Sequence, residues 1–429
     1  MISKIYRTLT YLAWPVLRAL PALRLRDGKE IKGRISERFG IPTTSRPDDK
    51  IVWFHAASNG ETLSAIPLIH SFLEKNPELH ILITTMTVTA ARLVEQRLGD
   101  NERITHQFIP YDHSSWVKEF HEYWKPNMAV WVESELWPNH LTMLKKNKIP
   151  SILVNARLSD KSVKRWFWVN DFFKSMMSCF DIILAQTDRD LNNLNVLGLE
   201  NVQSVGNLKD LAPALPFDPV AADDIRSVIE ARTCILFAST HDPEEEIARD
   251  IHVELKKKHP DLLTIIIPRH PKRGENIAND LNTDDLNIAR RSLKMSPRTN
   301  TDIYVADTLG EMGLFYDLCP IVFVGNSLDT KPGGGHNLME PAWFDCAIIS
   351  GDALHNFSTL ADEMPQQNAC EIVKNNNELI NKLNDLINDS ELKNELQKNA
   401  KTYVRQKQSN GLDRIIDAID PTCKKAKIL

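Results

Sequence analysis

A carboxylate, Glu61, follows a Ser-Asn-Gly turn in the run WFHAASNGETLSAIPLI. The apolar residues 51–55 predict a buried strand before this turn, and the spacing of the apolar residues after it predicts a helix. The carboxyl ends of parallel strands border the ligand crevice of an open sheet, so this turn is well placed for chemistry. The alternative is structural: Ser58 or Asn59 caps the helix, and Glu61 complements the positive end of its dipole.

Two polar turns in the other half of the chain could bind an anion. PRHP follows the apolar run LLTIII, so Arg269 and His270 are predicted to emerge at the carboxyl end of a strand. A guanidinium there can pair with two oxygens of a phosphate or carboxylate, although a surface salt bridge would explain the same residues. DTLGEMG places Gly310 and Glu311 at a helix start, where they could hold an anion through backbone amides or act only as a cap.

The most informative turn is GNSLDTKPGGGHNLMEPAW, residues 325–343. Consecutive glycines let a backbone approach a ligand closely, and the residues after them open a helix whose amino end favours phosphate. His336, Asn337 and Glu340 add side-chain donors and acceptors beside that backbone. Glycines alone would be consistent with a flexible loop, but this combination favours nucleotide binding.

Strands and helices that alternate along the chain must position these turns. Segments of helical pattern separate most of the predicted strands, which indicates wound, mostly parallel sheets with helices on both faces. The proline-rich stretch LAPALPFDP, residues 211–219, predicts a linker between two such domains, and a cleft between domains is a common ligand site. The predicted strands are 51–55, 81–85, 107–109, 128–132, 152–155, 182–185 and 202–205, then 234–238, 263–267, 303–305, 321–324 and 347–350.

The domain boundaries follow from this pattern. They are a basic apolar segment over 1–40, an α/β domain over 41–210, the linker over 211–219, a second α/β domain over 220–405, and a C-terminal helix with a basic tail over 406–429.

Composition excludes several classes of protein. The 429 residues are 42% hydrophobic and 25% charged, as in a folded soluble protein. The 6 cysteines are widely scattered and form no CxxC pair, which argues against a disulfide framework or a structural zinc site and fits a reducing compartment.

The first 40 residues are basic, with nine Lys or Arg against three Asp or Glu, while the whole chain has a net charge of −5. They contain LTYLAWPVLRALPALRL, in which Pro15, Arg18 and Pro21 interrupt the roughly 20 apolar residues that a membrane span needs. This basic apolar helix suits an anionic membrane surface, and packing on its own domain is the alternative. Nucleic acid is not an expected partner, because the rest of the chain is acidic.

Eight motifs occur in an order that resembles the Kdo transferases of lipopolysaccharide synthesis. They are HAASNGE, ESELWPN, NARLS, AQTDRD, GNLK, PRHP, ADTLGEMGLFY and GGHNLMEPA, and the match runs from the basic segment to about Phe357. These enzymes move 3-deoxy-D-manno-oct-2-ulosonic acid (Kdo) from CMP-Kdo to a lipid A precursor. The resemblance implies an inverting GT-B glycosyltransferase with two Rossmann-like domains, located at the cytoplasmic face of the bacterial inner membrane.

The resemblance also implies roles for individual residues. Glu61 matches the catalytic base, which would accept the proton of a glucosamine hydroxyl on the acceptor. No metal ion or cofactor is expected, since CMP-Kdo is a substrate and no Asp-x-Asp pair is obvious near these turns. The implied donor-binding residues are Arg269, His270, Gly310, Glu311, Met312, Gly335, His336, Asn337 and Glu340. The residues expected on the acceptor side or in support of Glu61 are Ser58, Gly60, Glu133, Glu135, Asn155 and Lys209.

Some residues depart from the family pattern. Asn59 replaces a small or apolar residue, Asn326 stands where a second Gly is expected, and GDALHNF lacks the usual Gly-Pro-His. Because most departures lie on the donor side, a changed donor preference stays open. Two other functions compete: a GT-B sugar-nucleotide epimerase, which would need no basic apolar N-terminus, and a non-catalytic membrane-surface protein, against which the retained Glu61, Arg269 and His336 argue.

Overall fold

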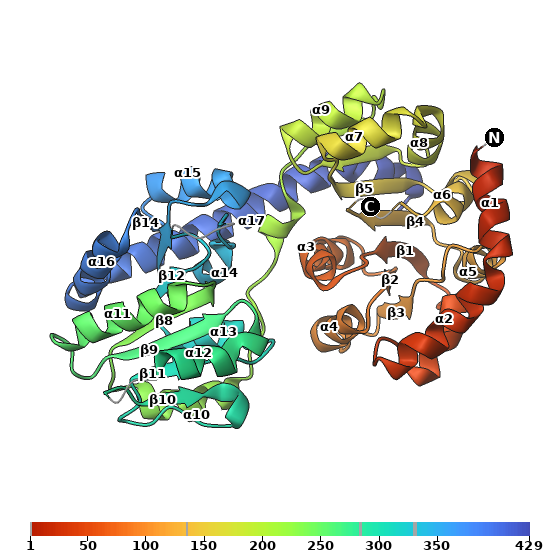
Figure 1. Cartoon of the computed structure of the whole chain (residues 1–429). Coiled ribbons are helices and arrows are strands. Elements are labelled where there is room, and N and C mark those ends of the chain that lie inside the picture. Colours follow the sequence, from red (N-terminus) through yellow and green to blue (C-terminus); the bar gives the residue numbers. More distant parts are fainter. Residues whose placement is uncertain (1, 134–135, 283–284, 329–332) are drawn as a thin grey trace. The chain divides into compact units, whose positions relative to one another are not determined.

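The computed structural model describes residues 2–133, 136–282, 285–328 and 333–429, and the chain forms two compact α/β units (Figure 1). Unit 1 comprises Met1–Pro213 and Gln408–Leu429, and unit 2 comprises Ala214–Lys407. Each unit contains a seven-stranded sheet whose neighbouring strands run parallel. The prediction of two α/β domains is therefore confirmed.

The sheet of unit 1 consists of β1 (Lys50–His55), β2 (Leu79–Thr85), β3 (Ile104–Phe108), β4 (Met128–Val132), β5 (Ser151–Ala156), β6 (Ile182–Ala185) and β7 (Val202–Ser204). Its strand order is β3-β2-β1-β4-β5-β6-β7, so the direction of winding reverses between β1 and β4. Connections leave the two strands at such a switch point toward opposite faces, which opens a crevice at their carboxyl ends. The residues directly after β1 and β4 are thus best placed to meet a ligand.

The sheet of unit 2 consists of β8 (Cys234–Thr240), β9 (Leu263–Pro268), β10 (Ile288–Arg290), β11 (Ile303–Val305), β12 (Ile321–Val324), β13 (Ala347–Gly351) and β14 (Glu371–Val373). Its order is β10-β11-β9-β8-β12-β13-β14, with the reversal between β8 and β12. The sequence did not predict β10 and β14, two edge strands of three residues each.

Helices cover both faces of each sheet, as parallel sheets require (Figure 1). In unit 1, α3 (Asn59–Lys75), α4 (Val88–Leu98) and the end of α17 (Ser390–Ala426) cover one face. The other is covered by α5 (Ser114–Trp124), α6 (Pro138–Lys146), α8 (Asn170–Met177) and α9 (Asp188–Val196), and α7 (Asp160–Phe167) and η2 (Leu208–Leu211) complete the unit.

In unit 2, one face is covered by α10 (Pro219–Ile229), α13 (Met312–Leu318), α14 (Met339–Ala342), α15 (Ser358–Gln366) and part of α17. The other is covered by α11 (Glu244–Lys256), α12 (Gly274–Leu281) and α16 (Asn376–Asn388). The remaining short elements are η3 (Pro271–Arg273), η4 (Arg291–Leu293) and η5 (His355–Phe357).

The N-terminal segment forms two helices, α1 (Ile2–Leu12) and α2 (Trp14–Arg26), and not the single helix that the sequence predicts. Pro15 occupies the first turn of α2, where its missing N–H costs nothing. The Tyr6 hydroxyl donates to Asp112 at 2.9 Å, which ties α1 to unit 1. In the part of the chain that the structure describes, no helix is both long and apolar enough to cross a membrane.

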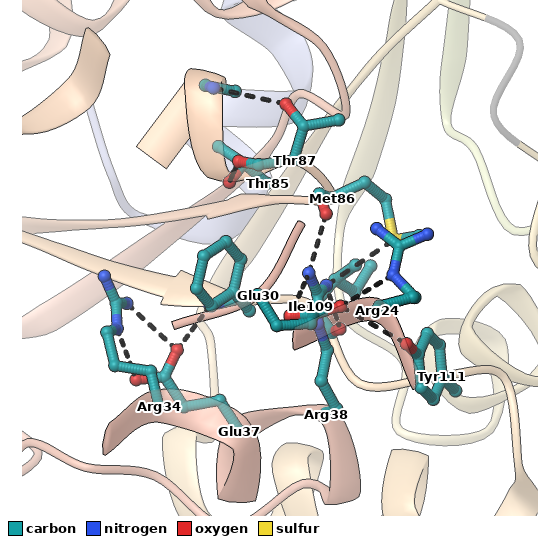
Figure 2. Close-up of polar contacts among 12 residues, drawn as sticks. Arg24, Glu30, Arg34, Glu37, Arg38, Thr85, Met86, Thr87, Ile109 and Tyr111 are labelled. Carbon is teal, nitrogen blue, oxygen red and sulfur yellow. Dashed lines mark hydrogen bonds and ion pairs between the residues drawn. The ribbon is translucent and has the colours of Figure 1, made fainter. Parts of the chain in front are cut away.

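A buried polar network fixes the next element, η1 (Lys32–Phe39), to the sheet of unit 1 (Figure 2). The Arg38 side chain is fully buried and donates to the carbonyl oxygen of Met86 at 2.7 Å and to the carboxylate of Glu30 at 3.1 Å. Glu37 is equally buried and accepts the backbone N–H of Phe108 at 2.6 Å. Each side chain therefore takes the place of a backbone hydrogen-bond partner at the carboxyl end of a strand, Arg38 at β2 and Glu37 at β3.

Candidate active site

Glu61 lies in the turn after β1, in the first turn of α3, and only 6% of it is exposed. Its Oε2 accepts the backbone N–H of Ala57 at 2.7 Å, and its Oε1 accepts the Ser58 hydroxyl at 2.8 Å. Ser58 is the N-cap, and its oxygen accepts the N–H of Glu61. Ser58, not Asn59, is therefore the capping residue, and the Glu61 side chain reaches back to Ser58 and to the residue before it, an arrangement that resembles a capping box.

A capped carboxylate can still act as a base. A carboxylate oxygen has two acceptor positions, so its bond to a capping group does not by itself prevent it from taking up a proton. The bonds to Ala57 and Ser58 also hold the carboxylate in a single orientation at the switch point of the sheet. The structural and the catalytic interpretations of Glu61 are thus compatible.

Three other residues expected near the acceptor gather at the same edge of the sheet. Lys209 forms an ion pair with Glu133 at 2.8 Å, and Asn155 donates to the same Glu133 oxygen at 3.4 Å. Asn155 also accepts the backbone N–H of Leu208 at 2.9 Å. The Lys209 stem passes the turn of Glu61 closely, because a Cβ added to Gly60 would lie 3.9 Å from its Cε. Glu135 lies outside the described residues.

The backbone at this edge is also unusual. Glu133 directly follows β4 and has a φ of 58°, and Asn155 near the end of β5 has a φ of 60°. Left-handed conformations are costly for residues other than glycine and concentrate at functional sites. The conformation of these two residues therefore supports a functional role for this edge.

Unit 2 contains a pocket of about 380 Å³ at the carboxyl ends of β8 and β9. Ser239 and Phe357 contribute to its wall, although the sequence did not single them out as site residues. Six of the nine expected donor-binding residues line it: Arg269, Gly310, Met312, His336, Asn337 and Glu340. His270, Glu311 and Gly335 are not among its lining residues.

The charges around this pocket suit an anionic ligand with hydroxyl groups. Arg269 is exposed and supplies a cation. Burial raises the pKa of Glu340 to about 7, against a smaller opposing effect of Arg269. Burial, with Arg269 and two other histidines, lowers the pKa of His336 to about 4. Arg269 thus brings a positive charge to the pocket, while burial shifts the pKa values of Glu340 and His336 toward their neutral forms.

Two of the expected donor residues outside the pocket lining lie against other parts of unit 2. Glu311 pairs with Arg291 at 2.6 Å, and that hydrogen bond holds its pKa below the usual range. Gly335 has a φ of 73°, and a Cβ there would lie 2.2 Å from the side chain of Leu354. A glycine is therefore required at this position because Leu354 of the same chain lies close to its backbone.

Sequence reasoning missed the residues that follow β8. Glu244 is buried and accepts the backbone N–H groups of His241 at 3.0 Å and of Asn326 at 2.7 Å. It thereby joins the turns after β8 and β12, the two strands at the switch point. The signal in the sequence was the run STHDPEEE at the end of a predicted strand, where a polar segment has the same placement as the Glu61 turn.

Comparisons with known proteins point to one family. Residues 33–211 match the family model described as 3-deoxy-D-manno-octulosonic-acid transferase (kdotransferase). The 3-deoxy-D-manno-octulosonic acid transferase of Rickettsia bellii is 35% identical over 410 residues, which are 95% of this chain and 96% of that protein. The transferase of the same name from Haemophilus influenzae is 30% identical and covers 97% of both chains.

Solved structures with low sequence identity show the fold alone. A putative UDP-N-acetylglucosamine 2-epimerase from Listeria monocytogenes has a TM-score of 0.57 at 14% identity, covering 88% of this chain and 97% of that one. A glycosyltransferase from Rickettsia africae has a TM-score of 0.57 at 10% identity, covering 88% of this chain and 100% of that one. Both are consistent with the GT-B class predicted from the sequence.

Proposed function

Because this chain belongs to the family of 3-deoxy-D-manno-octulosonic acid (Kdo) transferases, we propose that it moves Kdo from CMP-Kdo to a lipid A precursor. The observation that carries this proposal is 35% identity to a Kdo transferase along 95% of the chain. The epimerase alternative is less favoured, since the likeness to an epimerase is 14% identical and concerns the fold.

The donor CMP-Kdo binds in the pocket of unit 2. Its phosphate and the carboxylate of Kdo are anionic, and Arg269 can pair with two oxygens of either group. Glu340, which lines the same pocket, can accept hydrogen bonds from sugar hydroxyls. The pocket volume of about 380 Å³ lies within the range for small-molecule sites.

The transfer step uses Glu61 as a general base. Its carboxylate accepts the proton of a glucosamine hydroxyl on the acceptor while that oxygen attacks the anomeric carbon of Kdo. The bond from that carbon to the phosphate oxygen breaks in the same displacement, so the configuration is inverted. General base catalysis of this kind contributes ~100-fold to 10,000-fold. Lys209, Glu133 and Asn155 support this edge of the sheet, and no resident metal ion or cofactor takes part.

The lipid acceptor places the enzyme at a membrane surface, which in the family pattern is the cytoplasmic face of the bacterial inner membrane. Apolar side chains of α1 and α2 are exposed, among them Leu9 at 59%, Leu12 at 70% and Val16 at 69%. Exposed Arg7 and Arg18 lie on the same two helices. Apolar and basic side chains together favour an anionic lipid surface. Sedimentation with anionic but not neutral vesicles is the expected result.

The proposed reaction is tested by the mass of the product. Purified full-length protein is given CMP-Kdo and a lipid A precursor, with and without a chelator, and Glu61→Gln is assayed alongside. Added Kdo that persists with the chelator and disappears in the variant would support the reaction, the base and the absence of a required metal. No added mass, from folded protein that binds CMP, would contradict the proposed acceptor or donor.

A further inference from the structure

Two imidazoles meet at the switch point of the unit 2 sheet. His241 directly follows β8, and His336 lines the pocket. Their Nε2 atoms are 3.2 Å apart, while the ring centres are 5.4 Å apart and the ring planes differ by 19°. The ring centres are much farther apart than the two Nε2 atoms, although the ring planes are nearly parallel. The rings therefore do not overlap face to face, and their Nε2 edges point toward each other.

This contact limits where the protons of the pair can lie. Two Nε2–H groups would clash and two bare nitrogens would repel, so a single proton lies between the rings. His241 is not among the residues that line the pocket, whereas His336 is. If His241 donates, Nε2 of His336 accepts, and neutral His336 then carries its own proton on Nδ1. The tautomer of His336 is thereby set by the ring behind it.

We propose that His241 is a positioning residue that makes His336 a proton donor to the phosphate of the bound nucleotide. The proposal rests on the donor site described above, and it adds a residue and a step that the family pattern did not supply. The sequence could not show this pair, because its members are 95 residues apart.

The surrounding charges determine when the pair is protonated. Arg269, Arg273 and His270 oppose a positive charge on His241, and Glu245 favours it. Glu245 is itself paired with Arg273 at 2.8 Å, which weakens its influence. Burial is the largest cause that lowers the pKa of both histidines. Without a bound anion the pair is therefore neutral at pH 7, and the negative charge of a bound phosphate favours the uptake of one proton.

The proton balance of the step is then complete. With donor bound, the pair carries one extra proton and a single positive charge. As the bond from the anomeric carbon to the phosphate oxygen breaks, the Nδ1 proton of His336 moves to a phosphate oxygen. Nε2 of His336 takes the proton shared with His241, and both rings end neutral. The acceptor hydroxyl proton moves separately to Glu61.

Calorimetry of CMP binding to the full-length protein tests this inference. Titrations at about pH 7.5, where most CMP phosphate is dianionic, are repeated in buffers with different ionisation enthalpies. The wild type is expected to take up about one proton per CMP, because the pair changes from neutral to cationic. His241→Asn should still bind CMP but lose most of this uptake. His259→Gln, an imidazole of the same unit bonded to Asn384, is the matched control and should retain it.

Glu340 is a second group whose protonation can change, so Glu340→Gln is titrated in parallel to subtract its part. Proton uptake that is equal in His241→Asn and the wild type would overturn the proposal. If that variant does not fold, His241→Gln replaces it, and uptake equal to that of the wild type there would overturn the proposal equally. Wild-type protein that binds no CMP would instead overturn the donor site itself, and this proposal with it.

Discussion

Ser58 and Glu61 hold each other in a reciprocal contact: the Ser58 hydroxyl donates to Glu61 Oε1 at 2.8 Å, and the Glu61 N–H donates to Ser58 Oγ at 3.4 Å. Such a contact stabilises the start of α3 whether or not the carboxylate takes part in chemistry. A test of the base must therefore separate the loss of a cap from the loss of a proton acceptor.

Glu61→Gln makes that separation. Glutamine keeps an oxygen that can accept the Ala57 N–H and gains an amide that can donate to Ser58 Oγ, so the thermal unfolding temperature should change little. The rate of Kdo transfer should fall by ~100-fold to 10,000-fold, because an amide accepts no proton. Ser58→Ala is the converse control: it should cost about 1 kcal/mol of stability and reduce transfer far less. Near-normal transfer by folded Glu61→Gln would rule out Glu61 as the base.

Arg269→Lys tests the anion site. Lysine keeps the charge but loses the fork that pairs with two oxygens, so CMP should bind about tenfold more weakly, equivalent to ~1.4 kcal/mol. The measurement is the dissociation constant by calorimetry. Arg249→Lys, which pairs with Asp250 at the surface of unit 2, is the control and should leave binding unchanged. An unchanged affinity in Arg269→Lys would place the phosphate elsewhere.

Arg38→Met tests the buried network of η1. The side chains of Arg38 and Glu30 are at most 1% exposed. Removing Arg38 leaves buried Glu30 with Arg24 in place of two cations, and it takes the donor away from the backbone carbonyls of Met86 and Ile109. Unit 1 should lose ~3–5 kcal/mol of stability. Tryptophan fluorescence reports this unit, since eight of the nine tryptophans belong to it. Lys118→Met, from an exposed pair with Glu122, should cost under ~1 kcal/mol, and an equal loss in both variants would contradict the network's role.

The turns that carry chemistry could be predicted because each lies where hydrophobic periodicity changes from strand to helix. That change placed Glu61 after β1 and Arg269 after β9, as the structure does. The strands β10 and β14 left no such signal, because each has three residues and pairs with a single neighbour at the edge of the sheet.

Partners that are distant in the sequence could not be predicted. Glu311 was expected at the nucleotide, but its carboxylate pairs with Arg291, on a short helical turn with no motif of its own. Gly335 was expected to make room for a ligand, yet Leu354 occupies the space beside it. In both cases the local pattern placed the residue in its turn, whereas tertiary packing decided what lies beside it.

A cluster of buried histidines leads to the last prediction, which concerns acid stability. His121 and His140 pack against Trp53 in the core of unit 1, His55 packs against Trp131, and ring nitrogens of all three have no hydrogen-bond partner among the described residues. Burial lowers the pKa of His121 to about 4 and that of His55 to about 3. Each imidazole is therefore neutral in the folded protein over a range where it is charged in the unfolded chain.

The sign of the pH effect follows directly. The unfolded chain binds a proton at His121 below about pH 6.5, and the folded protein does so only near pH 4. Stability that is complete above pH 6.5 is thus lost as the pH falls through this window, by up to ~1.4 kcal/mol per pH unit for each histidine. His121→Phe should flatten the slope by about that amount. Urea unfolding of the full-length protein, followed by tryptophan fluorescence from pH 7.5 to 5, measures it against exposed His70→Gln as the control. A slope in His121→Phe equal to that of the wild type would show that His121 is already protonated in the folded protein.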